Sequence, residues 1–280
     1  MRNAVALRPV EADAAMAALG QLLALDTGVL NRAFRSATPF PHVLVDIELS
    51  EALTSAFPGP DWNGWTLLRD QYQPHKRHCP DIEQFPPSLQ RVVEGLNGSR
   101  AVQWLERVTG IDGLIPDPHL TGGGLHASTA GGILSPHTDF HDYGRLGVSR
   151  RINLLLYMNP GWTSADGGCL ELFHPGTRTA PAMSVVPAAG RIVIFETNDQ
   201  SPHGFTVPVA AGKTRNSVAL YFYTARRPDH FSGTAATGWA VTSAPRARVR
   251  WETSKALRRI ASGFGKLAYH LDPFEKESSN

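Results

Sequence analysis

Apolar residues recur at helical spacing in three stretches before Thr121. The stripes are formed by Met16, Leu19, Leu22 and Leu23, by Leu89, Val92, Val93 and Leu96, and by Ala101, Trp104, Leu105 and Val108. Residues three and four apart lie on one face of a helix, so each stripe predicts an amphipathic helix. Between the first two, His42–Asp46 has the pattern of a strand, and Ser50 is suited to cap a short helix that ends near Phe57.

From Thr121 to Thr224 the pattern changes to short apolar runs separated by Gly, Pro and Asn. The predicted strands are Gly124–Ser128, Ile152–Met158, Cys169–His174, Ser184–Pro187, Arg191–Glu196 and Asn216–Thr224. The gaps between them are too short for crossover helices, which favours antiparallel pairing in a sandwich or barrel.

The chain beyond residue 225 has a third character. It is rich in Arg and Lys, and an apolar stripe predicts one amphipathic helix, formed by Leu257, Ile260, Phe264, Leu267 and Leu271. We therefore expect an α+β protein with a helical part at 1–120, a β core at 121–225 and a basic extension at 226–280.

Composition narrows the class of protein. In 280 residues, 27 Lys and Arg balance 25 Asp and Glu, so the net charge of +2 does not indicate a nucleic-acid partner. Two cysteines cannot build a disulfide framework or a cysteine-rich zinc site. The apolar stretch Ala14–Leu25 is too short to cross a membrane and has acidic residues where a signal peptide carries positive charge. These features predict a soluble, cytoplasmic protein with no membrane partner.

Candidate metal ligands lie inside the predicted β core. His137 and Asp139 are two residues apart, so on an extended segment both side chains point to the same side. His203 follows the apolar strand Ile192–Phe195. Two histidines and one carboxylate on one face are the ligands of iron centres that keep three metal positions open.

The strand after His203 adds a candidate anion site. Its alternation puts Arg215, Ser217 and Tyr221 on one face of an otherwise apolar run. A buried arginine is costly without an anion, and its planar guanidinium suits a carboxylate held by two hydrogen bonds.

Together these residues resemble the Fe(II)/2-oxoglutarate-dependent dioxygenases of the prolyl-4-hydroxylase-like branch. The motifs that carry the resemblance are Gly122–His126, His137–Asp139, Leu154–Asn159, Gly167–Leu170, Ser201–Gly204 and Arg215–Ser217. The resemblance implies a double-stranded β-helix (jelly-roll, cupin-like) core, on which we expect the N-terminal helices and a C-terminal helix to pack.

The resemblance also assigns roles to residues. His137, Asp139 and His203 match the iron ligands, and Arg215 matches the residue that binds the distal carboxylate of 2-oxoglutarate. Three residues are expected to assist Arg215 in binding the co-substrate, namely Ser217, Tyr157 and Asn153. Three more are expected near the substrate, namely His126, Arg145 and Tyr221. A polar lid is expected from Asp142, Tyr143, Arg145, Arg150 and Arg151, and from Lys76 and Arg77.

The implied activity is that of an oxidoreductase, a dioxygenase that hydroxylates an unactivated C–H bond of an amino-acid or peptidyl residue. Fe(II), 2-oxoglutarate and O₂ are the implied cofactor and co-substrates, succinate and CO₂ the by-products, and L-ascorbic acid a candidate reductant. Asp139 favours hydroxylation over halogenation, because related halogenases have a small residue at that position.

Other readings stay open. The same centre can carry out hydroxylation, desaturation or cyclisation of a sugar or specialised metabolite. A pseudo-oxygenase would keep the fold as a binding module without catalysis, and a zinc hydrolase would use the same ligands without needing Arg215. Nucleic-acid demethylases of the superfamily place a second arginine where this chain has Tyr221.

Overall fold

The structure is a computed structural model that describes residues 9–68, 70–144, 146–225 and 237–239. The chain divides into two units, Met1–Trp239 and Ala240–Asn280, and all described residues belong to the first. This unit continues past the predicted boundary at residue 225, because a strand at Gly238–Trp239 pairs within it. Arg145 and the predicted C-terminal helix lie outside the described residues.

The described residues contain five α-helices, all before Thr121, with three strands between them along the chain. They are α1 (Pro9–Leu23), α2 (Thr27–Ser36), α3 (Glu51–Ser55), α4 (Pro87–Asn97) and α5 (Ser99–Thr109). The three helices predicted from apolar stripes are confirmed, and the Ser50 side chain caps α3 by accepting the Leu53 N–H. The sequence analysis missed α2, in which Phe34 is the one residue classed as buried, so its apolar signal was weak.

The predicted buried face of α1 was wrong in part. Met16 is 57% exposed, whereas Ala15, Ala18 and Leu22 are buried. A Cβ placed on Gly95 of α4 would lie 2.9 Å from the Leu19 side chain, so α4 presents a glycine where α1 comes close. Small residues allow the two helices to approach closely. The prediction relied on large apolar residues, so it did not include Ala15 and Ala18 in the buried face of α1.

Two antiparallel sheets form the jelly roll. The nine-stranded sheet has the order β1-β11-β8-β13-β5-β3-β2, with β4 on β13 and β7 on β8. The five-stranded sheet has the order β10-β9-β12-β6-β14. The strands are β1 (His42–Asp46), β2 (Thr66–Leu67), β3 (Lys76–Cys79), β4 (Ile115–Pro116), β5 (Gly124–Thr129), β6 (Leu134–Thr138), β7 (Asp142–Tyr143), β8 (Val148–Tyr157), β9 (Leu170–Leu172), β10 (Met183–Val185), β11 (Arg191–Glu196), β12 (His203–Phe205), β13 (Thr214–Thr224) and β14 (Gly238–Trp239).

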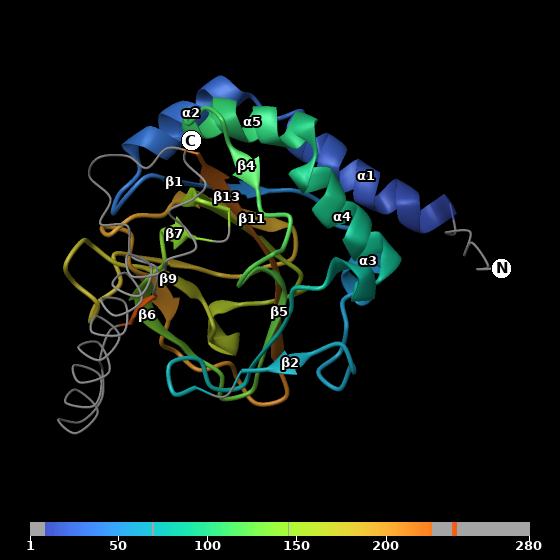
Figure 1. The fold of residues 1–280 in the computed structure, drawn as a ribbon. Coiled ribbons are helices and arrows are strands. Elements are labelled where there is room, and N and C mark those ends of the chain that lie inside the picture. The colour runs from blue at the N-terminus through green and yellow to red at the C-terminus, as the bar shows by residue number, and fades with distance from the viewer. Residues whose placement is uncertain (1–8, 69, 145, 226–236, 240–280) are drawn as a thin grey trace, which may run out of the picture. The chain divides into compact units, whose positions relative to one another are not determined.

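The larger sheet separates a helical layer from the interior of the jelly roll. Helices α1, α2, α4 and α5 lie together along one side, over β1, β11 and β13 (Figure 1). On β8, Leu154 and Leu156 belong to the core shared with the helices, whereas Leu155 and Tyr157 pack in other clusters, away from the helices. Both faces of β8 are thus covered, and its last four residues, Leu154–Tyr157, are apolar.

The six strands predicted beyond Thr121 are confirmed to within a few residues, and so is the strand predicted at His42–Asp46. Three of the missed strands, β6, β12 and β14, belong to the smaller sheet. Pro136 interrupts the apolar pattern of β6, and β12 has only three residues, so neither shows a clear alternation.

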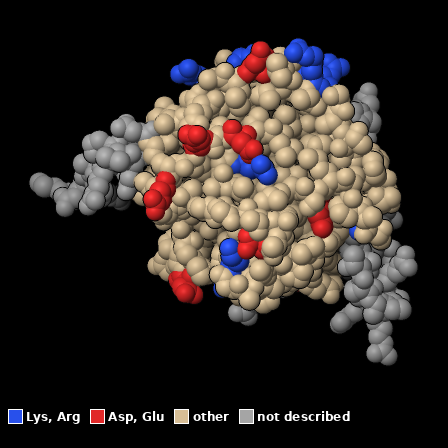
Figure 2. Space-filling view, turned by 180° about the vertical axis from the view of Figure 1, so that it is seen from behind, with Lys and Arg blue, Asp and Glu red and all other residues tan. Residues whose placement is uncertain are grey.

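Charge on the described surface is mixed. Seen from behind, acidic and basic side chains are interspersed on a mostly uncharged face (Figure 2). Among the described residues no single helix passes a length and hydropathy test for a membrane span, although Ala14–Leu23 and Thr27–Ser36 pass it jointly as a pair bent by 72°.

Replacing Leu22 by alanine tests the observed face of α1. Leu22 is buried between α1 and the sheet, so Leu22→Ala should lower the free energy of unfolding by about 2–5 kcal/mol in a urea titration. Met16→Ala on the exposed side should change it by less than about 0.5 kcal/mol. A larger loss for Met16→Ala than for Leu22→Ala would mean that the sequence stripe was right.

Candidate metal centre and co-substrate pocket

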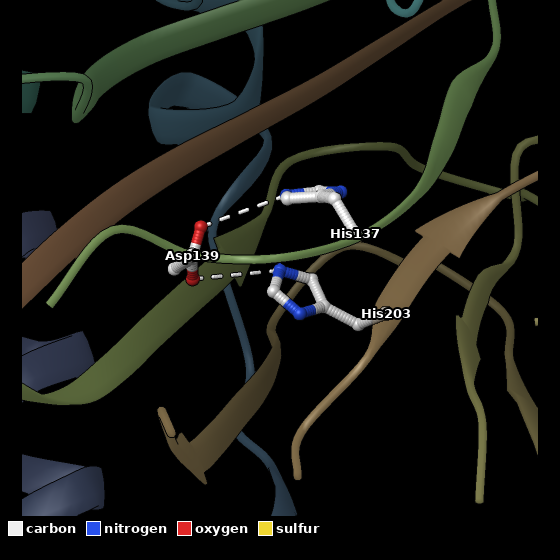
Figure 3. Close-up of side chains that lie close together, drawn as sticks. All are labelled: His137, Asp139 and His203. Carbon is white, nitrogen blue, oxygen red and sulfur yellow. Dashed lines mark ion pairs between the residues drawn. The ribbon is translucent and has the colours of Figure 1, made fainter. Parts of the chain in front are cut away.

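Three side chains from the smaller sheet converge at one point of its inner surface. His137 on β6 lies directly opposite His203 on β12, and Asp139 follows the end of β6. Their potential ligand atoms all lie within 4.8 Å of one another, and all three residues are buried. Both imidazoles point at the carboxylate (Figure 3), with each Nε2 3.6 Å from an Asp139 oxygen.

Backbone carbonyls fix the tautomer of both histidines. The Nδ1 of His137 lies 2.9 Å from the Ser135 carbonyl, and the Nδ1 of His203 lies 3.1 Å from the Ser201 carbonyl. A carbonyl oxygen only accepts, so each Nδ1 carries the proton and each Nε2 directs a lone pair at the centre. This is how metal-binding histidines are usually oriented, so the residues fit a divalent metal ion.

The glycine after His203 allows the two ligand strands to approach. A Cβ on Gly204 would lie 2.6 Å from the Leu134 carbonyl oxygen and 3.0 Å from the Pro136 nitrogen. The register also shifts at this point, between His203 and Phe205. The His-Gly pair of the sequence motif therefore combines a ligand with the space needed to bring it opposite His137.

Electrostatics keep the three ligands ready for a cation. Burial would raise the pKa of Asp139, but Arg150 and then the two histidines outweigh it and hold that pKa well below its usual value. Burial lowers the pKa of His203 to about 4, partly offset by Asp139. At neutral pH the centre thus offers a carboxylate and, at His203, an uncharged imidazole.

Two residues of β8 contact the metal ligand directly, which corrects the prediction for both. Asn153 donates from Nδ2 to Asp139 Oδ2 at 2.8 Å, so its amide contacts a metal ligand instead of the predicted carboxylate site beside Arg215. Arg150 was expected in a polar lid, yet it is 2% exposed and lies 3.1 Å from the same oxygen. A buried ion pair across two sheets leaves no trace in local sequence patterns.

Arg215 lies at the other end of the inner face. It is 7% exposed, donates from Nε to the Gly168 carbonyl at 2.6 Å, and donates from Nη2 to the Tyr157 hydroxyl at 3.1 Å. Gly168 leaves room for it, because a Cβ there would lie 2.8 Å from the Arg215 side chain. No carboxylate of the described residues is within ion-pair distance of Arg215, so its charge is available to an anionic ligand.

Tyr157 and Ser217 lie near Arg215: Tyr157 through a hydrogen bond, Ser217 two residues away on β13. They are cross-strand partners on β8 and β13, and both are buried. Burial raises the pKa of Tyr157, with Arg215 opposing it, so the phenol keeps its proton. Since its oxygen accepts from Arg215, its own O–H can be donated to the same anion.

A cavity of about 240 Å³ opens beside the metal ligands. His137 and Asp139 line it, together with Gln73, Lys76, His78, His126, Phe140, Tyr221 and Trp239, among others. The buried Nε2 of His126 has no hydrogen-bond partner among the described residues, and burial holds the pKa of His126 well below its usual value. His126 was expected near the substrate. In the structure it lines the cavity beside the metal ligands as a neutral imidazole.

Aromatic residues line the cavity from both sheets, Tyr221 from β13 and Trp239 from β14. The Trp239 ring lies between Tyr72 and His137, with centroids 4.9 and 4.7 Å away. Tyr221 donates its hydroxyl to the Gly122 carbonyl and packs its ring 3.4 Å from the Arg150 guanidinium carbon. The sequence analysis missed Trp239, because it lies in the segment that the motifs do not reach.

Lys76 is one of two cationic residues, with Arg150, among the described residues that line this cavity. Its amine donates to the Gln73 side chain at 3.1 Å, and burial, followed by the charge of Arg215, lowers the pKa of Lys76 to about 8. The sequence placed Lys76 only in a polar lid. The pairing of β3 with β5, which no local pattern reveals, is what brings Lys76 to the cavity.

Metal binding should depend on the histidines that face the centre. Anaerobic titration calorimetry with Fe(II) should give one ion per chain, and His203→Ala should abolish stoichiometric binding, because it removes a ligand from a three-ligand site. His174 is exposed, so His174→Ala should bind as wild type. Equal loss in both variants would show that the ion is held elsewhere.

The Lys76 amine should titrate near pH 8. Carbon-13 methylation of the lysines and NMR should give one resonance with this pKa, absent in Lys76→Met, with the amine charged below and neutral above it. Arg215→Ala should raise the value, because it removes a nearby positive charge. A pKa near 10.5 in the unmutated protein would mean that the amine reaches water.

Comparisons with known proteins agree with this geometry. Residues 123–223 match the family model of the 2OG-Fe(II) oxygenase superfamily. The prolyl 3-hydroxylase OGFOD1 of Xenopus laevis is 34% identical over 77 residues, and the prolyl 3,4-dihydroxylase OGFOD1 of Ostreococcus tauri is 32% identical over 87 residues. These matches cover 26% and 28% of this chain but only 15% and 17% of the relatives, so the similarity spans less than a fifth of their length.

Solved structures support the fold. A prolyl hydroxylase from Trichoplax adhaerens, in complex with a hypoxia inducible factor peptide fragment, superposes with a TM-score of 0.53 at 14% identity, covering 73% of this chain and 91% of that one. A prolyl 4-hydroxylase from Phytophthora capsici gives 0.51 at 18% identity, covering 88% and 75%. The jelly roll and the His-Asp-His centre agree with the family model matched by residues 123–223, so this part of the chain is similar to the 2OG-Fe(II) oxygenases.

Proposed function

We propose that this chain is an Fe(II)- and 2-oxoglutarate-dependent hydroxylase that acts on an amino-acid or peptidyl residue. The observation that carries the proposal is a pair of features within the jelly roll: a buried three-ligand centre, and a buried arginine, Arg215, that has no carboxylate partner among the described residues. A hydrolase needs only the ligands, whereas Arg215 and the Tyr157 hydroxyl supply a second, anion-binding end.

Two groups of residues have separate roles, one in binding the metal and one in binding the co-substrate. His137, Asp139 and His203 would hold Fe(II), which supplies the activation of O₂. Arg215 and Tyr157 would bind the distal carboxylate of 2-oxoglutarate, assisted by Ser217, and so fix the keto acid in one direction. The reaction converts substrate, O₂ and 2-oxoglutarate into hydroxylated substrate, succinate and CO₂, with one oxygen atom in each of the first two products.

The cavity supports a polar substrate. Lys76, His78 and His126 on one wall offer hydrogen-bonding groups, and Trp239 offers a flat aromatic surface on the other. The similar proteins named above are prolyl hydroxylases, which favours a peptide or amino acid. A sugar or specialised metabolite is the competing substrate class, and a substrate screen by succinate release, with acidic, neutral and basic peptides beside sugars, separates the two.

The state of the two cysteines is relevant to the cellular compartment in which the protein works. Cys79 and Cys169 are both buried and unpaired. Free thiols are typical of proteins in a reducing compartment, which supports a cytoplasmic location. Fractionation of cells that produce the full protein tests it, and recovery only from an oxidising compartment would contradict it.

Truncation of Arg215 should weaken the co-substrate without loss of iron. Arg215→Ala leaves the distal carboxylate desolvated and unpaired, a loss of about 2–5 kcal/mol that corresponds to roughly thirty-fold or more in affinity for 2-oxoglutarate. Arg215→Lys should recover part of the lost affinity, because the charge remains. Ser217→Ala should weaken the binding of 2-oxoglutarate by about 1 kcal/mol. The measurement is the visible charge-transfer band during anaerobic titration of 2-oxoglutarate at saturating Fe(II).

Iron content is the control in these variants and should equal that of the wild type, because Arg215 does not contact the three ligands. If Arg215→Ala binds 2-oxoglutarate as well as wild type does, the co-substrate assignment fails.

A further inference from the structure

We propose that Lys76 binds a carboxylate of the substrate, so that the enzyme selects a residue-sized group that carries a negative charge. The proposal rests on the proposed function, because it concerns the substrate of the same metal centre, and it goes further by assigning that substrate a charge. The carboxylate has two possible sources, the α-carboxylate of an amino acid or chain end and the side chain of an acidic residue within a peptide.

The charges that line the cavity do not balance. Asp139 is the one carboxylate among the described residues that line it, and Arg150 pairs with this carboxylate at 3.1 Å. Lys76 takes part in no ion pair within the described part of the chain. Because a desolvated cation without a partner is costly, an uncompensated lysine at a cavity indicates an anionic ligand.

The Lys76 amine is held at the cavity by a short chain of hydrogen bonds. It donates to Oε1 of Gln73 at 3.1 Å. Gln73 in turn donates to Asp70, from Nε2 at 2.7 Å and from its backbone N–H at 3.0 Å, which directs the amide oxygen toward Lys76. An ammonium group has three donors and Gln73 accepts one, so the other two are available to a ligand.

The anion position at Lys76 is distinct from the one at Arg215. Ser128 on β5 pairs with Lys76 on one side and with Arg215 on the other, so the three residues form one row across the larger sheet. Neighbouring strands are about 4.8 Å apart, which places the two backbones roughly 10 Å from each other. Arg215 contacts Tyr157 and Gly168, whereas Lys76 lines the cavity beside the metal ligands. The distal carboxylate of 2-oxoglutarate is assigned to Arg215, so the anion at Lys76 belongs to another ligand.

The cavity suits one residue-sized group. Its volume of about 240 Å³ is smaller than the roughly 300–1,000 Å³ of pockets for drug-sized ligands. Lys76 lines it from the larger sheet and His137 from the smaller one, so a group whose carboxylate binds Lys76 extends toward the metal ligands. The buried Nε2 of His126, which has no partner among the described residues, offers a second polar contact.

The electrostatics of Lys76 provide a readout that does not depend on turnover. Burial, followed by the charge of Arg215, lowers the pKa of Lys76 to about 8, and Asp139 and Asp70 oppose this shift. A carboxylate bound at the amine should raise this pKa, because an opposite charge favours the protonated form.

The test uses the full chain loaded with Zn(II), which does not activate O₂, and with 2-oxoglutarate. The probes are the N-acetyl derivatives of the common amino acids, each as the free acid and as the amide, and binding is measured by titration calorimetry. At least one carboxylate-bearing probe should bind at least about tenfold more tightly than its uncharged counterpart. A preference for acids over amides assigns the α-carboxylate, and a preference for Asp or Glu amides over Asn or Gln amides assigns a side chain.

Lys76→Met should abolish this preference by weakening the charged probe alone, and Lys76→Arg should keep part of it, because the charge remains. Lys213→Met is the matched control, since Lys213 is 43% exposed and pairs with Asp166, and it should bind all probes as wild type does. In the wild type, carbon-13 NMR of methylated lysines should show the pKa of Lys76 rise when the preferred probe is bound. A merely structural role for Lys76 would affect charged and uncharged probes alike.

The proposal is overturned if no carboxylate-bearing probe binds more tightly than its uncharged counterpart, or if the preference survives in Lys76→Met. It is also overturned if Lys76→Met weakens 2-oxoglutarate as much as Arg215→Ala does, because Lys76 would then serve the co-substrate. Absence of metal or 2-oxoglutarate binding in the wild type would overturn the proposed function instead.

Discussion

The pairing of β8 with β13 is the constraint on which the pocket depends. In this register Tyr157 lies opposite Ser217 and Asn153 lies opposite Tyr221, all on the inner face. The residues between them, such as Leu154 and Leu156, enter the core under the helices. If β8 slipped by one residue, its polar residues would face the helices and its leucines would face the pocket. The burial of Leu154 and Leu156 under the helices therefore fixes the geometry of the site.

The metal centre joins the two sheets. His137, Asp139 and His203 come from the smaller sheet, whereas Arg150 and Asn153, which hold Asp139, come from the larger one. The pocket therefore exists only when both sheets are assembled, and a buried ion pair makes their separation costly, because it would leave a charge without its partner. Glycines at the close approaches let the ligand strands and Arg215 reach this arrangement.

The sequence predicted what local periodicity and short motifs encode. Alternation along 215–221 was enough to place Arg215 and Ser217 on one face, and the His-x-Asp spacing indicated a shared ligand site. It did not reveal that Asn153 serves Asp139 instead of the co-substrate end, because strand alternation gives the face of a side chain but not its neighbour across the barrel. For the same reason, the sequence did not reveal that Arg150 pairs with Asp139.

Charge balance explains why the two ends of the pocket belong together. Arg150 neutralises Asp139, which leaves Arg215 and Lys76 as positive charges without a carboxylate partner among the described residues. Burial is the main cause of the lowered pKa of Lys76, and the charge of Arg215 lowers it further, so an anionic ligand bound near both cations would oppose the shift. A divalent metal ion that binds alone adds to this positive field, whereas the dianionic keto acid relieves it. On charge balance alone, binding of the metal together with the co-substrate is therefore favoured over binding of the metal alone.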